Sequence, residues 1–188
     1  MLFDWKLNAA YDSSMKKIYF LLMSSILSFG CATTNPPPTV PKVDLERFMG
    51  DWYVVGGILT FLEKGAHHAI ESYRLDEEGR IQTTFTFRKD SFDGPLKKYT
   101  PVGFVHDKET NAEWRMQFIW PFKAPFLIIY LDDEYKATAI ATDSKRYLWI
   151  MSRTPQMPEH LYNEIIALVT EQGFDVEKIV KVPQPEEG

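Results

Sequence analysis

Residues 50–53 read Gly-Asp-Trp-Tyr and decide the fold together with a second stretch far along the chain, Tyr-Leu-Trp-Ile-Met-Ser-Arg at residues 147–153. The first has the Gly-x-Trp-Tyr pattern that begins a β-strand, here at Gly50, and the second has the composition of the last long strand of an antiparallel sheet. Trp52 and Arg153 can meet across the closed end of a small barrel, with the guanidinium stacked on the indole. Such a contact is worth roughly 0.5–2 kcal/mol. A barrel closed at one end encloses a cavity that opens at the other end, and such a cavity implies a ligand.

The bulk composition limits the classes of protein that the chain can be. A length of 188 residues suffices for one domain with appendages and a sizeable core. Aromatic residues make up 14% of the chain, which suits a β fold. The formal net charge of −5 argues against a nucleic-acid partner, because phosphate binding needs a basic face.

The segment before residue 31 has the pattern of a secretory signal. Lys16 and Lys17 precede an apolar run at residues 18–29, which is shorter than the run of about 20 residues that spans a bilayer. Residues 27–31, Leu-Ser-Phe-Gly-Cys, resemble a bacterial lipobox, in which the signal is cut before the cysteine and the thiol receives a diacylglycerol.

Cys31, the one cysteine of the chain, is therefore the predicted lipidation site. The alternative is an ordinary secretory peptide whose cysteine is incidental. By the same resemblance, Ala32 after the cysteine favours sorting to the outer membrane.

These features divide the chain into three parts. Residues 1–30 are the predicted signal peptide, with residues 1–14 read as a mis-called start. Residues 31–42 hold the lipidated cysteine and a Pro-rich tether, since consecutive prolines favour an extended geometry. Residues 43–188 are the predicted globular domain.

The domain reads as an all-β fold with one helix. Short aromatic and β-branched segments, separated by turn residues, occur at residues 52–59, 66–75, 81–87, 99–105, 113–120, 126–131, 136–142 and 146–152. Eight such segments with a spacing of roughly 8–12 residues predict an antiparallel up-and-down barrel or a sandwich. The short links favour the barrel, which leaves no sheet edge exposed.

One helix is predicted after the last long strand. Pro158 suits its first turn, apolar residues recur on one face, and Gly173 ends it. Packing of this helix outside the barrel would explain why residues 126–131 are apolar on both faces. Residues 174–182 are then expected to form a short ninth strand.

These parts together resemble the lipocalin family. Residues 50–53 match that family's opening motif, Thr142-Asp143 resembles its second motif, and Arg153 resembles its third. Within the family, residues 147–155 and the lipobox are similar to the bacterial outer-membrane lipocalin, a relative of apolipoprotein D. The resemblance implies an eight-stranded calyx that holds a small apolar molecule.

A hollow calyx makes inward-facing apolar residues candidates for its lining. An eight-stranded barrel is just wide enough to hold one small ligand. The candidate lining residues are Phe104, Trp114, Met116, Phe118, Phe126, Ile128, Tyr147 and Trp149. For each of them, core packing is the alternative. Gly50, Trp52 and Arg153 are expected to close the base of the barrel instead of binding the ligand.

Metal binding and catalysis find little support in the sequence. His67 and His68 are adjacent, and adjacent residues of a strand point to opposite faces, so they cannot easily chelate one ion. Acidic residues cluster at 132–134, but in a predicted turn where such residues are common. We expect no metal, no cofactor and no enzyme activity.

Two segments are expected near the mouth of the calyx. Residues 63–68, Glu-Lys-Gly-Ala-His-His, are more polar than a lipid mouth requires, which indicates a different head-group preference. Residues 120–126, Trp-Pro-Phe-Lys-Ala-Pro-Phe, form either a bent hairpin or an apolar surface that serves as a lip or as a homodimer contact.

The resemblance therefore implies a transport lipoprotein that carries a fatty acid or lysophospholipid. It would be anchored through Cys31 to the outer membrane, on its periplasmic face. One alternative is an enzyme on the same barrel acting on a hydrophobic substrate, which a purely apolar cavity would dismiss. Another is an envelope scaffold, which a cavity too small for an acyl chain would favour.

Overall fold

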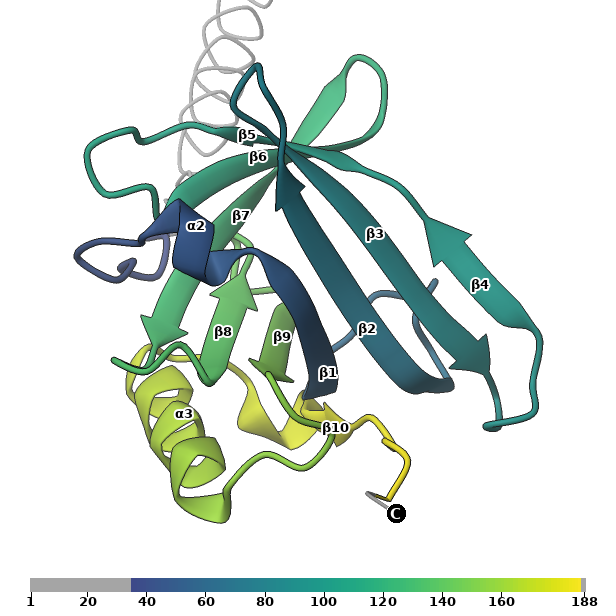
Figure 1. Cartoon of the computed structure of the whole chain (residues 1–188). Helices are drawn as coiled ribbons and strands as arrows, with labels where there is room; N and C mark the ends of the chain where they lie inside the picture. Colours follow the sequence, from purple (N-terminus) through teal and green to yellow (C-terminus); the bar gives the residue numbers. More distant parts are fainter. Residues whose placement is uncertain (1–34, 187–188) are drawn as a thin grey trace, which may run out of the picture. The chain divides into compact units, whose positions relative to one another are not determined.

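The computed structural model describes residues 35–186 (Figure 1). The predicted signal peptide and the predicted lipidation site Cys31 lie outside the described residues. The described part contains the elements α2 (Leu45–Phe48), β1 (Gly50–Ile58), β2 (Ala66–Leu75), β3 (Arg80–Lys89), β4 (Leu96–Tyr99), β5 (Val102–Val105), β6 (Glu113–Ile119), β7 (Phe122–Leu131), β8 (Ala137–Ala141), β9 (Leu148–Ser152), α3 (Glu159–Glu171), η1 (Val176–Lys178) and β10 (Val180–Lys181).

The long strands form a closed antiparallel barrel in which each strand pairs with its neighbour in sequence. β1 pairs with β2 on one side and with β9 on the other, and this second pairing closes the barrel. β4 and β5 both pair with β3 in a continuous register, so they act as one strand that is interrupted before β5. The interruption contains Pro101, which has no amide hydrogen to donate to a ladder. The predicted eight-stranded up-and-down barrel is confirmed.

Closure between β1 and β9 depends on a glycine. Gly57 has φ +155°, and a Cβ atom at this position would lie 2.0 Å from the carbonyl oxygen of Leu148. The register of the pairing also shifts between Val54 and Gly56. Only a residue without a side chain allows the two backbones to approach this closely.

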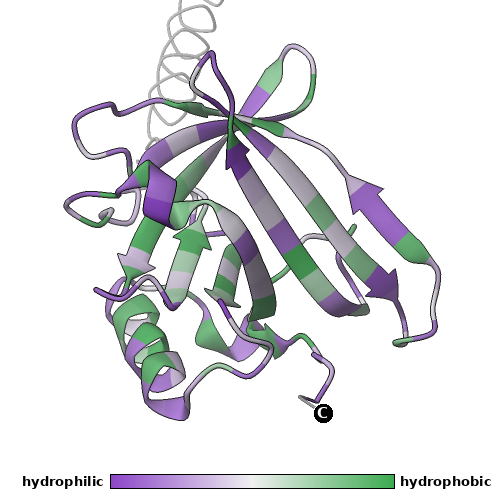
Figure 2. Cartoon of the chain, in the orientation of Figure 1, coloured by the Kyte–Doolittle hydropathy of each residue, from purple (hydrophilic) through white to green (hydrophobic). Residues whose placement is uncertain are grey.

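A second apolar core lies between the barrel and α3. Leu127 and Ile129 of β7 and Leu148 and Ile150 of β9 face this core, while the intervening residues face the barrel interior. Ile165 and Val169 of α3 are fully buried against these strands, and Figure 2 shows apolar residues on α3 and on the strands beside it. The predicted packing of the helix outside the barrel is confirmed.

The close approach of α3 is made possible by small side chains on β8. Ala137, Ala139 and Ala141 all face the helix and are fully buried. The helix ends where the sequence predicts, because Gly173 has φ +79°, a conformation that favours glycine.

The short ninth strand expected after the helix is present as β10, but it is shorter than the predicted residues 174–182. Residues 174–182 do not form one strand: they begin with η1, and only Val180 and Lys181 pair with β1, at Gly57 and Gly56. Phe174 and Val176 instead pack into the core beneath α3. This packing keeps residues 174–179 off the sheet, so that pairing with β1 begins only at Val180.

The closed end of the barrel is plugged by α2, which the sequence analysis did not predict. The Asp44 side chain caps this helix by accepting hydrogen bonds from the amides of Glu46 and Arg47. Phe48 is fully buried, with its ring centroid 5.1 Å from that of Trp52 and 5.4 Å from that of Trp114. The floor of the barrel is therefore a cluster of packed aromatic rings.

Candidate functional site

The barrel interior above this aromatic floor contains a cavity of about 290 Å³. This volume is near the lower end of the range of about 300–1,000 Å³ that is typical of small-molecule sites. Its wall is formed by residues of six strands and of the loops at the open end: Thr60, Phe61, Leu62, Glu63, Glu71, Thr83, Phe85, Tyr99, Pro101, Met116, Phe118, Ala124, Pro125, Phe126, Thr142, Tyr147 and Trp149.

Five of the eight candidate lining residues lie in this wall. Met116 and Phe118 alternate inward along β6, and Phe126 faces them from β7. Trp149 of β9 and Tyr147 of the turn before it also line the cavity, with ring centroids 6.3 Å apart. The structure thus brings together aromatic side chains that are far apart in the sequence.

The other three candidates do not line the cavity. Phe104 lies on the outer face of β5, where the ammonium of Lys123 is 3.5 Å from its ring centroid. Its neighbour Gly103 faces inward instead: a Cβ there would lie 2.9 Å from the sulfur of Met116 and 3.0 Å from Cβ of Ile81. The inward position is therefore occupied by the side chains of neighbouring strands.

Trp114 and Ile128 face inward but lie too deep to reach the cavity. Trp114 stacks on Phe126 at 5.2 Å between centroids and donates its indole N–H to the carbonyl of Asn111 at 2.8 Å. Ile128 is fully buried in the same core cluster. These two residues are part of the floor.

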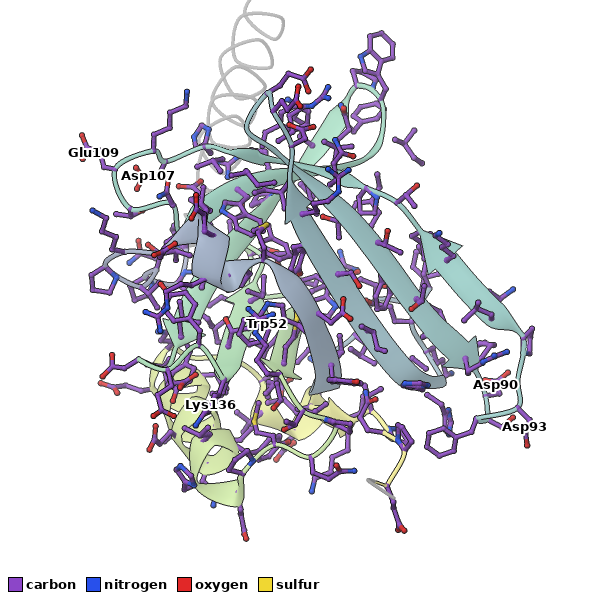
Figure 3. The ribbon with its side chains drawn as sticks, viewed as in Figure 1. Trp52, Asp90, Asp93, Asp107, Glu109 and Lys136 are labelled. Atoms are coloured by element: carbon purple, nitrogen blue, oxygen red, sulfur yellow. The ribbon has the colours of Figure 1, made fainter. Side chains whose placement is uncertain are left out.

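The base of the barrel contains the predicted contact between Trp52 and Arg153. The guanidinium carbon of Arg153 lies 3.8 Å from the centroid of the Trp52 ring, and Figure 3 shows Trp52 among the side chains enclosed by the barrel. Arg153 also donates hydrogen bonds to the carbonyls of Asp51 (2.9 Å), Arg47 (2.8 Å) and Phe48 (3.1 Å). It therefore links α2, β1 and the end of β9.

Gly50 is part of this same contact. Its φ of +94° favours glycine, and a Cβ there would lie 3.3 Å from a guanidinium nitrogen of Arg153. A larger side chain would press on the guanidinium that spans the base.

Two carboxyl groups lie in the cavity wall: Glu63, from the segment expected near the mouth but not expected to be buried, and Glu71, which sequence reasoning missed. Glu63 and Glu71 are only 6% and 7% exposed, and both belong to the cavity wall. A signal for Glu71 was present in the sequence, because it alternates with Ala69 and Tyr73 on the inward face of β2. No pattern of strand alternation could find Glu63, which lies in a loop.

Glu63 fastens the loop between β1 and β2 to β9, the strand that pairs with β1. One carboxylate oxygen accepts the indole N–H of Trp149 at 2.8 Å. The other accepts the amide and the hydroxyl of Thr60 at 2.7 and 2.6 Å. Both oxygens of this buried carboxylate therefore have protein partners.

Glu71 lies deeper, next to the aromatic floor. Its Oε2 accepts the hydroxyl of Tyr73, and no described residue hydrogen-bonds its Oε1. Burial raises the pKa of Glu71 to about 7, the hydrogen bond from Tyr73 opposes this shift, and the nearby charge of Glu63 adds to it. Burial also raises the pKa of Tyr73 well above its usual value, which keeps this phenol a donor.

The open end of the cavity is surrounded by exposed apolar side chains, which we call the lip. They belong to the loop between β1 and β2 and to the hairpin between β6 and β7: Phe61, Leu62, Phe118, Ile119, Trp120 and Phe122. Trp120 and Phe122 are 82% and 77% exposed. Phe61, Leu62 and Phe118 also line the cavity, so the lip is continuous with its interior.

The two histidines at the start of β2, His67 and His68, lie outside the cavity. His67 contacts the ring of Phe92, and His68 stacks on Tyr53 with ring centroids 6.3 Å apart. Within residues 35–186 no group of three histidine, cysteine or acidic side chains is placed to hold a metal ion. None of the helices in this part of the chain is long and apolar enough to cross a membrane.

Comparison with known proteins identifies the same architecture. The family model described as a lipocalin-like domain matches residues 43–184. The chain is 28% identical to the outer membrane lipoprotein Blc of Escherichia coli over 166 residues, which cover 86% of this chain and 93% of that protein. It is 26% identical to mouse apolipoprotein D over 157 residues, 79% of this chain and 80% of that protein. Insecticyanin from the tobacco hornworm Manduca sexta has the same fold, with a TM-score of 0.64 at 14% identity over 80% of this chain and 85% of its own.

Proposed function

The chain belongs to the lipocalin-like domain family, and we propose that it carries a fatty acid or a lysophospholipid, with one acyl chain in the barrel cavity and the polar head at the mouth. The observation that carries this proposal is the cavity itself, whose wall is aromatic and aliphatic above a closed floor. Burial of an acyl chain contributes about 0.8 kcal/mol per CH₂, so no charged partner is needed for useful affinity.

A carrier fits the cavity wall better than an enzyme does. The wall is not purely apolar, so the two carboxyls keep the enzyme alternative testable. Both oxygens of Glu63 are occupied by protein donors, and none of the described wall residues is a histidine, serine, cysteine or lysine. The pairing of a serine or cysteine nucleophile with a histidine base is therefore not assembled by these residues.

The ligand is tested by extraction and by displacement. Mass spectrometry of an organic extract of the purified protein should detect a fatty acid or lysophospholipid, and the protein should bind a fluorescent fatty acid that palmitate displaces. No extracted lipid together with no displacement would contradict the carrier function and favour the scaffold alternative.

A variant at the cavity wall sharpens this test. Ala124→Trp adds an indole to the wall and should weaken binding of the fluorescent fatty acid by about tenfold or more. Ala167→Trp makes the same change on α3 at a position that is exposed, as Ala124 is, but does not line the cavity, and it should bind like the unmodified protein. Equal binding by the two variants would place the ligand elsewhere.

We also propose that Cys31 carries a lipid anchor and holds the protein at the periplasmic face of the outer membrane. The name of the Escherichia coli relative, an outer membrane lipoprotein, supports this proposal. Cys31→Ser should move the protein from the membrane fraction to the soluble periplasmic fraction. Retention of the variant in the membrane fraction would argue against lipidation.

The lip supports a further partner, a second copy of the chain. Apolar patches as exposed as Trp120 and Phe122 are typical of interaction surfaces. We propose that two lips pack together in a homodimer, which would cover these rings.

A further inference from the structure

The cavity contains two buried carboxyl groups and no basic side chain. Glu63 and Glu71 both line it, and every other described residue of the wall is uncharged. A buried carboxylate without a cation is unfavourable unless hydrogen-bond donors stabilise it. The two carboxyls differ in how far the protein itself meets this need.

The protein itself supplies hydrogen-bond donors to both carboxylate oxygens of Glu63. Its two oxygens accept three hydrogen bonds, from Trp149 and Thr60, at 2.6–2.8 Å. A ligand could not use Glu63 without breaking the contact that holds the loop at the mouth.

For Glu71, the protein supplies a hydrogen-bond donor to only one of the two carboxylate oxygens. Tyr73 donates to Oε2, while Oε1 has no partner among residues 35–186. The side chain is more than nine-tenths buried, and it lies in the cavity wall between Trp52, its partner on β1, and Phe85, its partner on β3. One acceptor is thus available at the deep end of an otherwise apolar site.

The groups around Glu71 cannot compensate a second negative charge. The titratable groups of the cavity are Tyr73 on its own strand, Glu63 in the loop, and Tyr99 and Tyr147 on the wall. Arg153 lies beneath Trp52, where its hydrogen bonds go to backbone carbonyls. Above pH 7, where Glu71 is ionised, a carboxylate or phosphate at the deep end would therefore meet like charge, with no cation in the described wall to offset it.

A hydrogen-bond donor on the ligand at the deep end of the cavity would be stabilised by Glu71 and, if it is an ammonium, also by aromatic rings. A hydroxyl or an ammonium could donate to Oε1, and an ammonium would in addition lie among the aromatic rings of Tyr73, Phe85 and Phe126. Burial raises the pKa of Glu71 to about 7, and a bound cation would favour its ionised form.

We propose that Glu71 recognises the inner end of the ligand, so that the cavity prefers an acyl chain whose buried end carries a hydrogen-bond donor over one whose buried end carries an acid. This inference rests on the proposed function, since the acyl chain must enter the cavity with its carboxylate at the mouth. The ligands expected to bind are therefore acyl chains with a hydroxyl or an amino group at the ω position.

Four probes of equal chain length test the proposal by calorimetric titration of the full chain in its C31S form. They are dodecanoic acid, ω-hydroxydodecanoic acid, ω-aminododecanoic acid and dodecanedioic acid. The ω-amino and ω-hydroxy acids should bind at least about tenfold more tightly than dodecanedioic acid.

Glu71→Gln removes the charge while keeping the shape, and should reduce the preference for the ω-amino acid over dodecanedioic acid by about fivefold or more. Glu113→Gln, the same change on the outer face of β6, should preserve the preference. An unchanged preference in Glu71→Gln, or equal binding of all four probes, would overturn this inference alone. Failure of every probe to bind would instead overturn the proposed function.

Discussion

Arg153 is the residue that joins the separate parts of the barrel base. Its guanidinium stacks on Trp52 and donates to carbonyls of α2 and β1, two elements that precede it by about a hundred residues in the chain. Truncation of this side chain would remove the stacking and leave several partly buried carbonyls without donors.

Arg153→Ala should lower the free energy of unfolding by about 2–4 kcal/mol. Arg146→Ala removes an exposed arginine that also lies near a ring, and it should change stability by no more than about 0.5 kcal/mol. Urea denaturation of both variants measures the difference. Equal midpoints would show that the base does not depend on Arg153.

Glu71 makes the stability of the barrel depend on pH. Its pKa rises from 4.5 to about 7 on folding, so between these values the folded state binds more protons than the unfolded state. The contribution of Glu71 to the free energy of unfolding is therefore fully present at and below pH 4.5. It falls as the pH rises towards 7 and stays constant above that pH.

This loss should amount to roughly 3 kcal/mol, because one pKa unit corresponds to about 1.36 kcal/mol. The measurement is urea denaturation at pH 5 and pH 8 for the unmodified protein and for Glu71→Gln. The variant should lose this part of the pH dependence, and an identical pH dependence of both proteins would refute the burial argument.

At the scale of elements, α3 shows how small residues set the distance between a helix and a sheet. The three alanines of β8 leave room for Ile165 and Val169, so that strands β7 to β9 are covered on both faces. This second core explains why residues 126–131 of β7 read as a continuous apolar run without strict alternation.

Ala139→Leu should destabilise the protein by about 1–3 kcal/mol, because the added atoms have no space beneath the helix. Ala167→Leu makes the same change at an exposed position of α3 and serves as the control. Thermal unfolding of both variants distinguishes them. A melting temperature for Ala139→Leu as high as that of the control would indicate that α3 does not pack tightly on β8.

At the scale of the whole molecule, the lip governs association. If two lips pack together, the double variant Trp120→Ser/Phe122→Ser should sediment as a monomer under conditions in which the unmodified protein is a dimer. Phe92→Ser, an exposed phenylalanine outside the lip, should leave the dimer intact. Identical sedimentation of all three proteins would rule out the lip as the dimer contact.

The sequence by itself determined the eight segments of the barrel, the helix α3 and their order, but not α2 or η1. Aromatic and β-branched segments between turn residues marked the strands, recurrence of apolar residues at helical spacing marked α3, and the conformational preference of Gly173 marked its end. The Trp52 and Arg153 motifs predicted a contact across the base because their residue types stack in a specific geometry. These signals are local, or they depend on one recognisable pair.

The tertiary structure alone decided which inward-facing residues reach the cavity. Trp114 and Met116 both face inward on β6, yet only Met116 lines the cavity, because depth along the barrel depends on how neighbouring strands are staggered. Phe104 is more apolar than Gly103, yet Gly103 faces inward, because side chains of two neighbouring strands already fill the space. Glu71 became a candidate for recognition only when folding enclosed its side chain in the cavity wall and left Oε1 without a partner among the described residues, which no pattern of residue types can show.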